Sequence, residues 1–409
     1  MDFVEHLWRL VIEKIGHSVA FAILSVVVAL LWILGRYVLR LLEHAWCFLQ
    51  SRDRALRAVA RVVTKDGAQE GKGVWLTEPI YQPDDYRNKI TRSKILSIAN
   101  LKGGVGKTTI AANIGAYLAR DWRKRVLLID LDFQGSLSSM AFPGKTWPRS
   151  SLAAKLISGD IKPDLVAQGA QDVDLGETED SCGSLKVITA HYDLAQADNR
   201  LMVEWLLQCR PKVPKSLRDA LREIITGKLF RTRDVRYTLA ETLHSDAVQD
   251  AVDLIIIDCP PRLTTSEIQA FCASSHLLIP TIFDRTSSEA VHSLCDQIEI
   301  LKVKVCPHLR YLGVVGTMWI ATHSVQPQTR ALVQKMLQEA NIAIDVLPPA
   351  KCVPHTTKLV KNADEGIAFL NMPQWQDHAE IRNTIGGLAG YVASQMGIPP
   401  PSSFQEAAE

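Results

Sequence analysis

The sequence predicts an α/β protein with a mostly parallel, twisted sheet that helices cover on both faces, preceded by a transmembrane helix. Three observations support this prediction. From residue 94 onward, short apolar runs rich in β-branched residues alternate with helical segments, which is typical of a buried parallel sheet. A glycine-rich loop, NLKGGVGKTT at 100–109, lies between one such run and a helix. Near the N-terminus, a long apolar stretch carries no formal charge.

The composition is that of a globular protein. The chain has 409 residues, 47% of them hydrophobic and 22% charged, enough for two average domains or one large α/β domain. The net charge of +2 gives no general argument for nucleic-acid binding, so any such argument needs a local patch. The eight cysteines are scattered, without a C-x-x-C pair, which disfavours a disulfide framework or a zinc site.

The apolar stretch IGHSVAFAILSVVVALLWILG lies between Lys14 and Arg36. Its 21 residues would form a helix of roughly 31 Å, long enough to cross a hydrocarbon core. A buried core helix would show a polar face, which this stretch lacks, and a cleaved signal peptide would show a small-x-small site. We therefore expect a transmembrane helix over 17–37, after a short extracytoplasmic tail over 1–16.

The flanking charges predict the orientation of this helix. Two basic residues precede the stretch and five follow it closely: Arg9 and Lys14 before it, and Arg36, Arg40, Arg52, Arg54 and Arg57 after it. By the positive-inside rule, the C-terminal side faces the cytoplasm. The prediction is a single-pass protein of the bacterial inner (cytoplasmic) membrane, with the lipid bilayer as a partner. A basic juxtamembrane helix over 38–63 and a Gly/Pro-punctuated linker over 64–93 follow.

Residues 94–395 carry the alternating pattern and form one predicted domain. Its strands are expected over 94–100, 125–132, 252–261, 275–283, 310–320 and 341–349, with a helix over 108–121 that begins in the glycine-rich loop. Between the second and third of these strands, residues 145–250 are a long insertion with helices of its own. Residues 396–409 are expected to be a flexible tail.

The glycine-rich loop has the residues of a phosphate-binding site. Backbone N–H groups from Gly104 to Thr108 would surround a phosphate at the helix N-terminus, where the helix dipole favours an anion. Lys107 would neutralise the β and γ oxygens, and the Thr108 hydroxyl would bind Mg²⁺. The predicted nucleotide-binding residues are Lys102, Gly103, Gly104, Val105, Gly106, Lys107, Thr108 and Thr109. A strict G-x-x-x-x-G-K-[ST] loop would have glycine where Leu101 stands, so Lys102 is an added feature.

Three ordered motifs resemble those of the ParA/MinD class of P-loop ATPases. KGGVGKTT resembles its deviant Walker A motif, VLLIDLDFQGSLSS its switch I segment, and DLIIIDCPPRLTT its Walker B motif and switch II. LGVVGTMW and LPPAKCVPHTTKLVKNADEGIAF are similar to its last two strand regions. The resemblance covers about residues 94–395, and it implies the P-loop NTPase fold with ATP and Mg²⁺ as cofactors.

The resemblance also implies roles for the site residues. Lys102 would reach across a nucleotide-sandwich homodimer to the phosphates bound by the other subunit, and Asp132 would position the attacking water. Asp258 would hold a Mg²⁺-bound water as the Walker B carboxylate, with Asp130 as possible support. The implied activity is ATP hydrolysis to ADP and phosphate, slow until an unknown protein partner stimulates it. The chain would then be a membrane-anchored nucleotide switch that recruits or positions a partner, in partition, localisation or a related process.

Two basic segments leave DNA binding open. Nine Lys or Arg residues lie from Arg210 to Arg236; they could contact DNA phosphates, anionic lipid or an acidic partner, or form a solvated helix face. A smaller patch consists of Lys351, Lys358 and Lys361. The alternative function is therefore an ATP-gated DNA tether of a mobile element or phage-defence system. A membrane tyrosine autokinase is disfavoured because the C-terminal segment PSSFQEAAE has no tyrosine.

Overall fold

The computed structural model describes residues 22, 25–39, 75, 82–83, 85–92, 94–145, 150–176, 183–207, 234–320, 322, 325–357, 359, 365–372 and 379–401. The chain divides into two units, one made of Met1–Arg57 with Lys212–Phe230 and the other of Ala58–Pro211 with Arg231–Glu409. The described part of the first unit is a helix over 25–39, together with residue 22. Every other described element belongs to the second unit.

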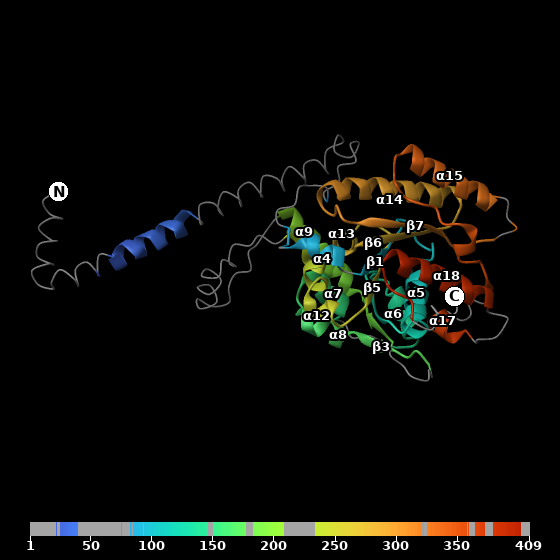
Figure 1. The fold of residues 1–409 in the computed structure, drawn as a ribbon, viewed down its shortest axis with the longest axis horizontal. Helices are drawn as coiled ribbons and strands as arrows, with labels where there is room; N and C mark the ends of the chain where they lie inside the picture. The colour runs from blue at the N-terminus through green and yellow to red at the C-terminus, as the bar shows by residue number, and fades with distance from the viewer. Residues whose placement is uncertain are drawn as a thin grey trace, which may run out of the picture. The chain divides into compact units, whose positions relative to one another are not determined.

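The helix over 25–39, drawn in blue in Figure 1, carries exposed apolar side chains such as that of Leu31, which is 61% exposed. In the part of the chain that the structure describes, no helix combines the length and the apolarity needed to cross a membrane. The transmembrane helix predicted over 17–37 is therefore not supported, and the predicted inner-membrane localisation is wrong. The tail over 1–16 and most of the juxtamembrane helix over 38–63 lie outside the described residues.

The second unit is built on a seven-stranded sheet with the order β3-β4-β2-β5-β1-β6-β7. Its strands are β1 (Ile95–Ile98), β2 (Arg125–Asp130), β3 (Gln171–Val173), β4 (Ser184–Ile188), β5 (Leu254–Asp258), β6 (His276–Thr281) and β7 (Arg310–Gly316). All neighbouring strands are parallel except β3 and β4 at one edge. The predicted α/β class with a mostly parallel sheet is confirmed.

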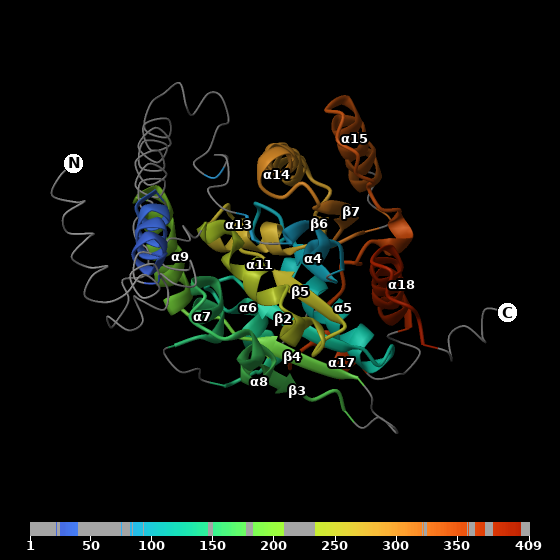
Figure 2. The same ribbon diagram turned by 60° about the vertical axis from the view of Figure 1, so that its left-hand side comes forward.

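Helices cover both faces of the sheet, as Figures 1 and 2 show. The helices on one face are α5 (Lys107–Arg120), α6 (Ser136–Ala141), α17 (Ala368–Asn371) and α18 (Ala379–Gln395). The helices on the other face are α4 (Tyr86–Arg92), α7 (Leu152–Ser158), α8 (Val166–Gly169), α9 (Asp193–Leu207), α11 (Thr238–Leu243), α12 (Asp246–Gln249), α13 (Thr265–Ala273), α14 (Arg285–Lys304) and α15 (Val325–Glu339). The short 3₁₀ helices are η2 (Pro163–Leu165), η3 (Val235–Tyr237) and η4 (Pro349–Lys351).

Strand residues alternate between the two cores because successive side chains of a strand point to opposite faces. In β5, Ile255 and Ile257 enter the core on the α13 side, whereas Leu254 and Ile256 enter the core on the α5 side. Both faces are covered, so all of β5 is buried and its sequence is a continuous apolar run. This run ends at Asp258, which brings a carboxylate to the carboxyl edge of the sheet.

The segment over 145–250 is more than an insertion with its own helices, because part of it completes the sheet. Both β3 and β4 lie in this segment, and β4 runs parallel to β2 from Ser184 to Ile188. Neither strand was predicted, since each is short and lies at or next to the sheet edge. Conversely, the strand predicted over 341–349 is reduced to a single bridge between Val314 and Val346.

Two segments predicted to be peripheral contribute to the core. The predicted linker over 64–93 contains α4, whose Tyr86 and Ile90 are buried. The predicted tail over 396–409 begins with a buried Met396. In both cases a few apolar side chains pack on the domain although the residues around them are polar or rich in proline. The hydrophobic pattern of the sequence therefore did not predict that these side chains are buried.

Candidate active site

The carboxyl ends of the central strands bring the predicted site residues together. In the sheet register, Asp130 of β2 lies opposite Asp258 of β5, and Asp258 lies opposite Ile98, the last residue of β1. Ligands of open parallel sheets bind at this edge. The loop that follows β1, the two carboxylates and the start of α5 therefore form one site.

The glycine-rich loop has the shape of an anion-binding loop. Gly104 and Gly106 have φ angles of 72° and 83°, left-handed values that glycine adopts without steric cost. Asn100, which is fully buried, accepts the Lys102 backbone N–H at 2.9 Å and donates from Nδ2 to the Pro280 carbonyl at 2.7 Å. These bonds fix the start of the loop, and Gly106 is the N-cap of α5. The free N–H groups of the first turn and the helix dipole favour a phosphate here.

Lys107 is the first residue of α5 and points back into the loop. Its side chain is buried, and its Nζ donates a hydrogen bond to the Lys102 carbonyl at 3.0 Å. Burial lowers the pKa of Lys107, while the charges of Asp258 and Glu267 oppose this shift. Because an ammonium has three donors, phosphate oxygens can join or replace the Lys102 carbonyl as acceptors.

Thr108 and Asp258 meet at the base of the site. The Thr108 hydroxyl donates to Asp258 Oδ2 at 2.7 Å, and Oδ1 of the same carboxylate is buried without a hydrogen-bond partner among the described residues. Burial raises the pKa of Asp258 well above its ordinary value, and the neighbouring Asp130 raises it further. A buried carboxylate is costly unless a donor or a cation compensates it. The pair therefore fits Mg²⁺, which keeps several waters and takes few protein oxygens when phosphates also bind it.

Asp130 and Asp132 have different surroundings. Asp130 is fully buried and accepts the Asp132 N–H at 3.0 Å, the Ser138 N–H at 2.9 Å and the Ser138 hydroxyl at 2.7 Å. Burial raises the pKa of Asp130 to about 6 although these hydrogen bonds oppose the shift. Asp130 thus holds the loop after β2 in shape. Asp132 lies on this loop, half-buried, and its carboxylate accepts the Gln134 N–H at 3.0 Å.

The Lys102 ammonium does not lie in the phosphate loop. It donates to Thr286 Oγ1 at 2.6 Å and to Ser287 Oγ at 2.8 Å, and it lies 3.4 Å from both carboxylate oxygens of Asp284. Asp284 is the N-cap of α14 and accepts the Ser287 N–H. Sequence reasoning did not identify these residues, although an aspartate between a strand and a helix is an N-cap signal.

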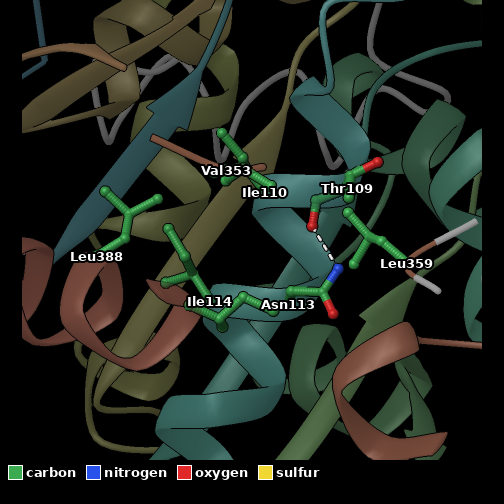
Figure 3. A pocket seen from close by; sticks show the side chains of 8 residues that line it. Thr109, Ile110, Asn113, Ile114, Val353, Leu359 and Leu388 are labelled. Carbon is green, nitrogen blue, oxygen red and sulfur yellow. Dashed lines mark hydrogen bonds between the residues drawn. The ribbon is translucent and has the colours of Figure 1, made fainter. Parts of the chain in front are cut away.

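A cavity of about 220 Å³ opens beside the loop. Its lining residues come from α5, the end of β7 and the segment after η4, and they include Gly106, Ile110, Thr317, Met318, Val353 and His355. Figure 3 shows a smaller apolar pocket next to it, where the Asn113 side chain donates to the Thr109 carbonyl at 2.7 Å. Apart from Gly106 and Thr109, none of these residues was predicted to belong to the site, because apolar walls look like core in the sequence.

The two predicted basic segments are described only in part. Residues 208–233 lie outside the described structure. Arg236, the last residue of the first segment, is fully buried in an ion pair with Asp234 at 2.7 Å, so its side chain is not available to contact DNA. Lys351 of the second patch lies over the Tyr391 ring, and the other two lysines of that patch lie outside the described residues.

The chain is similar to proteins of one family. A family model described as an AAA domain (AAA_31) matches residues 93–311. The chromosome partitioning protein ParA of Caulobacter vibrioides is 30% identical over 235 residues, which cover 58% of this chain and 73% of that protein. The chromosome-partitioning ATPase Soj of Thermus thermophilus is 30% identical over 250 residues, which cover 60% of this chain and 78% of that protein.

Solved structures of McdA share the fold. Apo McdA has a TM-score of 0.55 at 18% identity and covers 73% of this chain and 99% of its own. A Cyanothece McdA variant in complex with ATP also has a TM-score of 0.55, at 19% identity, with 75% and 98% covered. The family model spans more than half of the chain, and the ParA and Soj matches span more than two thirds of those proteins. The chain therefore belongs to the ParA/MinD class of P-loop ATPases, the AAA_31 family of AAA domains.

Proposed function

We propose that the protein is a Mg²⁺-dependent ATPase that acts as a nucleotide switch. ATP assembles a sandwich homodimer, and hydrolysis to ADP and phosphate releases it. The observation that carries this proposal is the pair formed by Thr108 and Asp258 beside the N-terminus of α5. One oxygen of the carboxylate accepts the hydroxyl at 2.7 Å, and the other is buried and unpartnered among the described residues. A cation on a bound nucleotide would compensate this carboxylate.

The residues around the loop would bind the phosphates of ATP. The N–H groups of the first turn of α5 would receive the β-phosphate, and Lys107 would exchange its bond to the Lys102 carbonyl for β and γ oxygens. When bound, Mg²⁺ would neutralise charge on these oxygens. Thr108 would bind it directly and Asp258 through a water. The apolar cavity beside the loop, with Ile110 on its wall, has the character of a site for the base.

Hydrolysis requires a water placed in line with the γ-phosphate. Asp132 is the candidate for orienting this water, because it lies on the loop that Asp130 holds in shape. Lys102 would reach the phosphates of the opposite subunit, where a second cation stabilises the transferred charge. Since each subunit then completes the other's site, turnover depends on dimerisation. We expect it to remain slow until a protein partner orders the dimer.

The process that we propose for this switch is the partition or positioning of a cargo. Two of the similar proteins, a ParA and a Soj, are both described as chromosome-partitioning proteins. A dimer that forms with ATP and dissociates after hydrolysis can hold a partner for the lifetime of the nucleotide. The partner itself is proposed only as a protein that stimulates turnover.

A Thr108→Val variant tests the metal site, with Thr108→Ser as the matched control. Valine keeps the shape of threonine and lacks the hydroxyl, whereas serine keeps the hydroxyl. We expect Thr108→Val to weaken Mg-ATP binding by about tenfold or more, because a hydrogen bond or ligand bond to a charged group is lost. Binding of ATP without Mg²⁺ should be unchanged. Isothermal titration calorimetry measures both, and equal Mg-ATP affinity in parent and Thr108→Val would contradict the assignment.

A further inference from the structure

The Lys102 ammonium is saturated within its own subunit. Its three N–H donors face Thr286 Oγ1 at 2.6 Å, Ser287 Oγ at 2.8 Å and the Asp284 carboxylate at 3.4 Å. These three acceptors, which we name the α14 cap site, present one negative charge and two hydroxyls. The geometry is that of an acceptor set for an ammonium, and Lys102 is only one third exposed there.

We propose that the α14 cap site (Asp284, Thr286 and Ser287) is a resting site for Lys102 in the nucleotide-free subunit, and that it competes with the partner subunit's phosphates for this lysine. This inference rests on the proposed function, in which Lys102 acts across a dimer. One ammonium cannot occupy both sites. The free energy of the resting contact therefore reduces the free energy gained when the dimer forms. Asp284, Thr286 and Ser287 act as positioning residues, and they set the ATP concentration at which the dimer forms.

The α14 cap site can release Lys102 without leaving an unpaired buried charge. Asp284 Oδ1 also accepts the Ser287 N–H at 2.7 Å and the Thr286 hydroxyl at 3.0 Å, and the Asp284 side chain is 44% exposed. Burial raises the pKa of Asp284, but hydrogen bonds from Ser287 and Thr286 and the Lys102 charge lower it overall. The carboxylate therefore stays ionised and capped after the lysine leaves. The resting contact is reversible for this reason.

A second bond links this resting contact to the phosphate site. The Lys107 Nζ donates to the Lys102 carbonyl at 3.0 Å, so Lys107 holds the peptide group that directly follows the Lys102 side chain. When a phosphate draws Lys107 away, the Lys102 carbonyl loses its partner and the loop can turn. Gly103 and Gly104 follow directly, and a Cβ at Gly104 would meet no atom within 4 Å. Nucleotide binding in one subunit thus favours release of its own Lys102 toward the other.

An Asp284→Asn variant of the full chain tests the competition. Asparagine keeps the N-cap acceptor and removes the charge. With Mg²⁺ and a non-hydrolysable ATP analogue, we expect the dimer of Asp284→Asn to be about two- to fivefold tighter than the parent dimer, the range of an exposed ion pair. The control is Asp172→Asn, which removes a similar ion pair with Lys186 at 3.3 Å on the β3–β4 edge, and which should leave the dimer unchanged. Sedimentation velocity measures all three proteins.

A dimer of Asp284→Asn that is weaker than or equal to the parent dimer would overturn the inference. A weaker dimer would mean that the α14 cap site stabilises the dimer, and an equal one that the site does not affect dimerisation. Thr286→Val removes the shortest contact and keeps the carboxylate, and it should shift the dimer in the same direction as Asp284→Asn. It provides the same test if Asp284→Asn does not fold.

The resting contact also has a readout that does not require a dimer. Without nucleotide, the Lys102 amine should react faster with an amine-modifying reagent in Asp284→Asn than in the parent, as measured by peptide mass spectrometry. Equal rates would refute the resting contact. A parent protein that stays monomeric with the ATP analogue would refute the proposed function instead, and the amine reactivity would then support or refute the contact by itself.

Discussion

Replacing Asp258 with asparagine should stabilise the nucleotide-free protein while abolishing its Mg²⁺-dependent ATPase activity. Asp258 and Asp130 are opposite each other on adjacent parallel strands, and both are buried. Burial, and then the charge of Asp130, raises the pKa of Asp258 well above its ordinary value. Asparagine has nearly the same shape and can still bond to Thr108, but it carries no charge to bury. A residue kept for the fold alone would not show opposite effects on stability and activity.

The magnitude follows from the pH dependence. The unfolded chain ionises Asp258 near pH 4, whereas the folded chain retains the proton to higher pH. The parent therefore loses stability as the pH rises above 4, by at most about 1.4 kcal/mol per pH unit for this one proton. Asp258→Asn lacks this loss. The two proteins should be equally stable near pH 4 and differ by at most about 3 kcal/mol at pH 6, where Asp130, with its pKa raised to about 6 by burial, is about half ionised.

Urea unfolding without nucleotide at pH 4.5, 6 and 8 measures this difference, and a phosphate-release assay with Mg-ATP measures activity. The matched control is Asp253→Asn. Hydrogen bonds and charge from Arg125 outweigh burial and lower the pKa of Asp253, so its removal should destabilise the protein at pH 8. If Asp258→Asn is less stable than the parent at pH 8, or hydrolyses Mg-ATP at the parental rate, the reasoning on this carboxylate pair is refuted.

Two further predictions concern the loop after β2 and the buried basic residue. Asp132→Ala should bind ATP and dimerise but hydrolyse on the order of 10²-fold more slowly, because the water loses its orienting carboxylate; single-turnover kinetics at the parental rate would contradict this role. Arg236→Ala should lower the free energy of unfolding by about 3–5 kcal/mol, since it removes the guanidinium that compensates the charge of the fully buried Asp234. The exposed ion pair between Arg125 and Asp253 is the comparison: Arg125→Ala should lower the free energy of unfolding by less than about 1 kcal/mol. Equal losses for the two variants in urea unfolding would contradict the prediction that burial sets the size of the loss.

Local sequence patterns were sufficient to predict the phosphate loop and the central strands. The loop needs glycines at left-handed positions and a lysine at the helix start, and these requirements fall within ten adjacent residues. Likewise, β5 is a continuous apolar run that ends in Asp258 because both faces of the sheet are covered. Both signals depend only on residues that are adjacent in the chain, so they can be recognised in a single sequence.

Contacts between distant residues could not be predicted in this way. Lys102 meets Asp284 across 182 positions of sequence, and nothing near either residue indicates the other. The different surroundings of Asp130 and Asp132 also depend on Ser138 and on the depth of the strand end.

The most direct test of the central claim, that ATP joins two subunits through Lys102, is a paired measurement of ATP binding and mass. Calorimetry and light scattering with Mg²⁺ and a non-hydrolysable ATP analogue would be applied to the parent, Lys102→Ala and Lys107→Ala. We expect the parent to bind and double its mass from 45.4 kDa, Lys102→Ala to bind and remain a monomer, and Lys107→Ala not to bind. A Lys102→Ala protein that dimerises like the parent, or that loses as much ATP affinity as Lys107→Ala, would contradict the account.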